Sequence, residues 1–86
     1  MRVLFDQGTP VPLRVARALL AAAEEANFEV LLTTDQSFPD QQNIAARRIA
    51  VIVLPTTDWR EIRRHADMVV TALNASTAGA CLRVSW

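Results

Sequence analysis

The sequence predicts an α/β domain: a small domain of two or three layers, built on a mostly parallel four-stranded sheet. Short runs of apolar or β-branched residues without helical spacing recur along the 86 residues. Segments whose apolar residues keep helical spacing separate these runs, so strands and helices alternate along the chain. In addition, 51% of the residues are hydrophobic, which argues against a disordered chain. We therefore expect a single domain over residues 1–86.

The first half of the chain contains two of the expected strands. Arg2–Phe5 is the first strand and Val30–Thr34 is the second. Between them, apolar residues at helical spacing predict a helix over Val11–Ala26, and Asn27 suits the left-handed conformation that ends a helix. After the second strand, a short helix is expected over Pro39–Arg47.

The second half of the chain completes the alternation. Ile49–Leu54 is the most apolar run and predicts an interior strand. The last helix is expected to begin near Asp58, where Glu61 completes a capping-box pattern. The side chains expected on its buried stripe are Trp59, Ile62, Ala66, Val69, Val70 and Leu73. Ala80–Trp86 alternates with a period of two, which predicts an edge strand.

An aspartate follows each of the first two strands. Asp6 ends the run RVLFD, and Asp35 ends the run EVLLTTD. Ligands of open α/β sheets bind at the carboxyl ends of the strands, so two neighbouring strands ending this way predict one acidic site. The alternative interpretation is that both aspartates cap helices or form turns after a strand.

Composition excludes several classes of function. Nine arginines balance nine acidic residues, so the charge predicts neither a general nucleic-acid binder nor a membrane-surface protein. The single cysteine, Cys81, cannot form an internal disulfide, and this favours the reducing cytoplasm. We expect neither a signal peptide nor a membrane span, because the N-terminus lacks a long apolar region.

Several sequence stretches together resemble the PIN-like toxin family, in particular its small branch long labelled a domain of unknown function. These stretches are RVLFDQGTP, VLLTTDQ, QQN, RRIAVIVL and the last helix with its leading tryptophan. The resemblance covers Met1 to about Leu13 and resumes near Leu19. It implies a metal-dependent ribonuclease, often the toxin of a toxin–antitoxin pair, whose carboxylates hold Mg²⁺ or Mn²⁺. Asp6 and Asp35 match the acidic residues of the family.

The chain departs from the family pattern after about Leu13, where an internal segment is missing. The resemblance implies that this segment contains an edge strand, and that an acidic residue belongs where this chain has Ala18. Two carboxylates can hold one Mg²⁺ together with waters and substrate phosphate. They rarely suffice for two-metal cleavage, so we expect weak or undetectable nuclease activity. Asp40 and Asn43 are candidates for further oxygen ligands.

Two classes of function therefore remain open. The first is an endoribonuclease with Asp6 and Asp35 as metal ligands, and with Arg47 and Arg48 as weak candidates for binding RNA phosphates. For these arginines, a solvated surface is the simpler interpretation. The second is a non-catalytic remnant that oligomerises or binds a partner, such as an antitoxin protein.

A homodimer is expected from the handedness of crossovers. Parallel β-α-β connections are right-handed in about 98% of cases. If the strands follow one another in sequence order, all helices should then lie on one face of the sheet. The other face would be bare, although the second and third strands are apolar on both sides. We therefore expect a second copy to cover it, by packing of sheet faces or by exchange of the N-terminal strand and helix.

Overall fold

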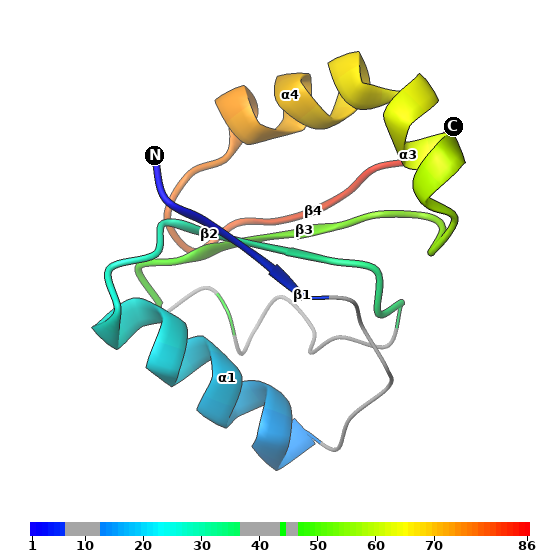
Figure 1. Ribbon diagram of the computed structural model, residues 1–86. Helices are drawn as coiled ribbons and strands as arrows, with labels where there is room; N and C mark the ends of the chain where they lie inside the picture. Colours follow the sequence, from blue (N-terminus) through cyan, green and yellow to red (C-terminus); the bar gives the residue numbers. More distant parts are fainter. Residues whose placement is uncertain (7–12, 37–43, 45–46) are drawn as a thin grey trace.

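The sheet has four parallel strands, as the sequence predicts, in the order β1-β2-β3-β4 (Figure 1). The strands are β1 (Val3–Asp6), β2 (Val30–Thr33), β3 (Ala50–Val53) and β4 (Cys81–Arg83). They come from a computed structural model that describes residues 1–6, 13–36, 44 and 47–86. The predicted α/β class is confirmed, and so is the edge position of the last strand.

The first helix, α1 (Leu13–Glu25), ends as its sequence predicts. Asn27 adopts the left-handed conformation, with φ of 65°. The Phe28 N–H donates to the Ala23 carbonyl at 3.0 Å, and the Asn27 N–H donates to the Glu24 carbonyl at 3.0 Å. This pair of hydrogen bonds is a Schellman motif, which satisfies carbonyl groups left free at the end of a helix.

Two predictions in the first half of the chain fall largely on undescribed residues. The start of the first helix before Leu13 lies outside the described part of the chain, as does most of the predicted Pro39–Arg47 helix. Ile44, which is described, is helical and completely buried. Within the described ranges, no helix has the length and apolarity needed to cross a bilayer.

The last helix is divided in two, which the sequence did not predict. Asp58 caps α3 (Trp59–Arg64) by accepting the Arg60 N–H at 2.9 Å, as expected, but α3 stops at His65 and α4 (Ala66–Ala75) begins there. The His65 ring stacks on Trp86, with the ring centroids 4.4 Å apart. The single buried stripe was therefore a wrong prediction. Ile62 and Val69 are buried, whereas Trp59 is 59% exposed and Val70 is 53% exposed.

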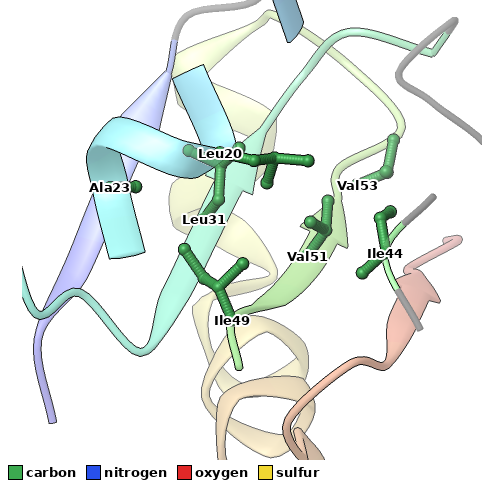
Figure 2. Packing of buried hydrophobic residues seen from close by; sticks show 7 residues of the cluster. All are labelled: Leu20, Ala23, Leu31, Ile44, Ile49, Val51 and Val53. Carbon is green, nitrogen blue, oxygen red and sulfur yellow. The ribbon is translucent and has the colours of Figure 1, made fainter. Parts of the chain in front are cut away.

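Two hydrophobic clusters cover the two faces of the sheet. Alternate residues of a strand point to opposite faces, so each strand contributes to both clusters. The first cluster lies beneath α1 and contains Leu20, Ala23, Leu31, Ile44, Ile49, Val51 and Val53 (Figure 2). The second cluster lies beneath α3 and α4 and contains Val30, Ala50, Ile52, Leu54, Ile62 and Val69. The domain therefore has three layers, with the sheet in the middle.

The positions of the helices overturn the expectation of a bare face. The strands do follow sequence order, but α1 lies on one face while α3 and α4 lie on the other (Figure 1). Each connection moves one strand in the same direction across the sheet, because the strands follow sequence order. Two such connections that pass over opposite faces of the sheet must have opposite handedness. The β1–α1–β2 crossover is right-handed and the crossover from β3 to β4 is left-handed. The premise of the homodimer prediction was therefore wrong.

Burial of the second face explains the rare left-handed crossover. A preference of 98%, taken as a population ratio, corresponds to about 2 kcal/mol. Full burial of a Leu or Ile side chain contributes about 1.5–3 kcal/mol. Ile52 and Leu54, both completely buried on the α3–α4 face, together outweigh the preference for a right-handed connection.

Candidate functional site

The two strand-end aspartates lie on neighbouring strands, as the sequence predicts. β1 pairs with β2 in parallel, and the register places Asp6 beside Thr33. Asp35 follows Thr33 by two residues, just beyond the end of β2. Both aspartates are thus at the carboxyl edge of the sheet, where ligands of parallel sheets bind.

Thr33 connects the two aspartates. Its hydroxyl donates to Oδ2 of Asp6 at 3.4 Å and accepts the backbone N–H of Asp35 at 3.1 Å. Thr33 is completely buried, Asp35 is 3% exposed and Asp6 is half-buried. The register pairs Thr33 with Asp6, and this pairing brings the Thr33 hydroxyl to the Asp6 carboxylate.

The chemistry of this group suits a hard divalent cation. Carboxylate and hydroxyl oxygens are the ligands that Mg²⁺ prefers, and one or two carboxylates can hold it. Across the described residues, no group of three or more His, Cys, Asp or Glu side chains comes together to hold a metal. Asp40 and Asn43, the candidate additional ligands, lie outside the described residues. The described carboxylates are therefore too few to hold two cations.

The position where the family resemblance implies a further acidic residue is Ala18. It lies on α1 and is exposed, whereas its neighbour Leu20 packs into the cluster beneath that helix. Alanine has no oxygen ligand in its side chain. Ala18 therefore contributes nothing to a metal site.

A second polar group lies farther along the same edge and was not predicted from the sequence. The Gln36 amide donates to the main-chain carbonyls of Thr34 and Leu54. The Arg83 guanidinium donates to Oε1 of Gln36 at 3.4 Å and to its main-chain carbonyl at 3.1 Å. The sequence signal for this contact is weak, because Gln36 follows one predicted strand, Arg83 lies within another, and the two residues are 47 positions apart.

Strand register explains why Arg83 shares this edge with Asp6. Asp6 pairs with Thr33, Thr33 pairs with Val53, and Val53 pairs with Arg83. This row crosses the whole sheet at its carboxyl end. Its two outer members carry opposite charges, on the two edge strands.

Arg47 and Arg48, the weak candidates for RNA binding, lie at the opposite end of the sheet. They precede β3, and therefore lie at the amino edge of the parallel strands. The Arg47 guanidinium contacts Oε1 of Glu24 at 2.6 Å, and the Arg48 N–H donates to Oε2 at 3.0 Å. The hydrogen bond from Arg47 is the main cause that lowers the pKa of Glu24 below its ordinary value. The structure does not bring these arginines to the acidic edge.

Cys81 has the environment of a structural side chain. It lies on β4, is half-buried and packs against the cluster beneath α1. Burial raises the pKa of its thiol, and a neutral thiol is a poor nucleophile.

The comparisons with known proteins add no relative. No family model, curated protein or solved structure matches this chain. The resemblance to the PIN-like family therefore remains a proposal that rests on the sequence stretches given above.

Proposed function

We propose that this chain is a truncated PIN-like domain of the metal-dependent endoribonuclease class, with weak or undetectable activity. One observation supports it most. Asp6 and Asp35, which match the acidic residues of that family, end adjacent strands and are joined through the hydroxyl of Thr33. The Thr33–Asp6 hydrogen bond joins side chains on two strands that are 27 residues apart in the sequence, and a turn alone does not produce such a contact.

Asp6 and Asp35 are the proposed ligands for one Mg²⁺ or Mn²⁺ ion. Thr33 orients the Asp6 carboxylate through its hydrogen bond, and β2 fixes the backbone that carries Asp35. When bound, the cation would polarise a phosphate oxygen of RNA and activate a water molecule. The proposed activity is weak because Ala18 supplies no carboxylate for a second cation.

A non-catalytic remnant that binds a partner is the second candidate function. It is favoured by an exposed apolar surface at the edge strand β1, where Phe5 is 42% exposed and Trp59 is 59% exposed. Surfaces of this kind often mark protein interfaces. In this case a homodimer, with or without strand exchange, or an antitoxin protein would be the partner. For either function we propose the cytoplasm as the location.

Thermal unfolding with and without Mn²⁺ tests the proposed metal site. A cation at 100 times its Kd stabilises the folded state by about 2.7 kcal/mol. For a domain of this size that raises Tm by roughly 10 °C or more. Asp35→Asn should abolish this rise, whereas Asp67→Asn, an exposed acidic residue in the first turn of α4, should retain it. If millimolar Mn²⁺ leaves the unfolding curve of the wild-type protein unchanged, there is no metal site.

A further inference from the structure

An apolar groove lies on the α3–α4 face. Leu32 of β2, Ile62 of α3 and Val69 of α4 line it, together with Trp59, Arg63 and Val70. Its volume is about 230 Å³. The groove is present because α3 and α4 pack over β3 and β4 and leave part of β2 uncovered, so that Leu32 is only half-buried.

An exposed aromatic pair connects this groove to the acidic edge. Trp59 lies in the groove and contacts Phe5 edge to face, with centroids 6.0 Å apart and ring planes at 74°. Phe5 directly precedes Asp6 on β1. The side chains of these two neighbours therefore point to opposite faces of the sheet. Because Trp59 is 59% exposed, much of its indole ring is open to a ligand. The aromatic pair therefore extends the apolar surface of the groove to β1.

Three exposed arginines lie beside the groove. Arg60, Arg63 and Arg64 surround an open hollow of about 370 Å³, and Arg63 also lines the groove. Across the described residues, the ion pairs found are those of Glu24 with Arg47 and Arg48, and none of the three α3 arginines has such a partner. Each of these guanidinium groups can therefore donate to an anionic group of a ligand.

We propose that this groove binds unpaired nucleotides of single-stranded RNA, with a base stacked on Trp59 and phosphates held by the arginines of α3. Proteins bind single strands by this combination of an aromatic surface with a positively charged groove. An apolar protein segment would fill the groove but leave three positive charges without partners. The choice of RNA as the polyanion rests on the proposed function.

Binding of a labelled oligoribonucleotide tests the proposal. A fluorescein-labelled single-stranded octaribonucleotide is titrated with the full chain in EDTA, so that binding does not require the metal site. Trp59→Ala should weaken binding roughly tenfold or more, and Trp59→Phe should retain most of the affinity. Met68→Ala is the matched control, because Met68 is 38% exposed on α4 and does not line the groove. It should bind like the wild-type protein.

Two further measurements separate stacking from charge. In a Trp86→Phe background the fluorescence reports on Trp59 alone, and stacking of a base should quench it. Arg63→Gln should reduce the slope of log affinity against log salt by about 1. Arg2→Gln removes the same charge at the amino edge, where Arg2 lies over Phe28, and should leave the slope unchanged.

The proposal fails if the wild-type protein does not bind the oligoribonucleotide, or if Trp59→Ala binds it as tightly as the wild type does. It also fails if Trp59→Ala instead dissociates a dimer in sedimentation, which would identify the groove as a protein interface. The Mn²⁺ unfolding experiment is independent of these outcomes. If Mn²⁺ raises the Tm but Trp59→Ala does not weaken RNA binding, the proposed metal site is retained and only the proposed RNA-binding groove is rejected.

Discussion

Acidic side chains at the two ends of the sheet have different kinds of partners. At the amino edge, Glu24 contacts Arg47 and Arg48, which joins the end of α1 to the start of β3. At the carboxyl edge, the neutral hydroxyl of Thr33 donates to the Asp6 carboxylate and accepts the main-chain N–H of Asp35. Opposite charges in contact stabilise the fold, whereas a hydrogen bond from a neutral hydroxyl leaves the negative charge of a carboxylate in place.

This contrast separates a structural charge cluster from a functional one. At the amino edge Glu24 has its partners Arg47 and Arg48 within the chain, so a further ligand would have to compete with them. At the carboxyl edge the Asp6 carboxylate accepts from an uncharged hydroxyl, and carboxylate oxygens suit a cation. We therefore expect substitutions at the amino edge to change stability, and substitutions at the carboxyl edge to change binding.

The largest expected effect concerns RNA cleavage. With Ala18 in place of an acidic residue, we expect Mn²⁺-dependent cleavage of single-stranded RNA to be undetectable, or at least roughly 100-fold slower than in a complete site. A time course with end-labelled RNA measures it, with Asp6→Asn and EDTA as controls. Rapid Mn²⁺-dependent cleavage that Asp6→Asn abolishes would contradict this prediction and make the carboxyl edge a complete active site.

Local patterns predicted the strands and the acidic pair. The run Val30–Thr34 has no helical spacing and is apolar, and it forms β2 within one residue of the predicted bounds. Asp6 and Asp35 could be placed together because carboxyl ends of neighbouring parallel strands share one edge. The conformation of Asn27 was predicted because few residues other than glycine tolerate a positive φ.

The remaining features depend on tertiary contacts that no local pattern contains. The contact between Gln36 and Arg83 joins residues 47 positions apart. The exposure of Trp59 is a tertiary feature, and so is the end of α3 at His65, whose ring stacks on Trp86. The left-handed crossover could not be foreseen from a rule that holds for 98% of connections, because burial of Ile52 and Leu54 decides it.

Removing the charge of Glu24 should have the next largest effect. Because its pKa is lowered in the folded state, Glu24 stabilises the fold at pH values above its ordinary pKa of 4.5, and this contribution is lost as the pH falls through the folded-state pKa. Glu24→Gln should lower the free energy of unfolding at pH 7 by about 1 kcal/mol. Its unfolding should also depend less on pH below 4.5. Urea unfolding at pH 7 and pH 3 measures both changes.

Glu25→Gln is the matched control at the amino edge. Glu25 is the next residue on α1 and is exposed. The Glu25→Gln substitution removes the same formal charge as Glu24→Gln. Its unfolding free energy should stay within about 0.5 kcal/mol of the wild-type value. Equal losses for the two variants at pH 7 would mean that Glu24 acts through net charge, and the amino edge would then have no specific ion pair.

The smallest effect is expected for Arg83→Gln at the carboxyl edge. Arg83 is exposed, and its two hydrogen bonds to Gln36 measure 3.4 and 3.1 Å, so their net contribution should be below about 1 kcal/mol. Gln36→Ala should cost more than Arg83→Gln, because the Gln36 amide also donates to the carbonyl of Leu54 next to β3. Urea unfolding of both single variants and the double variant gives the coupling energy between the two side chains. A loss above 2 kcal/mol for Arg83→Gln would show that the carboxyl edge is held together by charge as the amino edge is, and the contrast between the two edges would disappear.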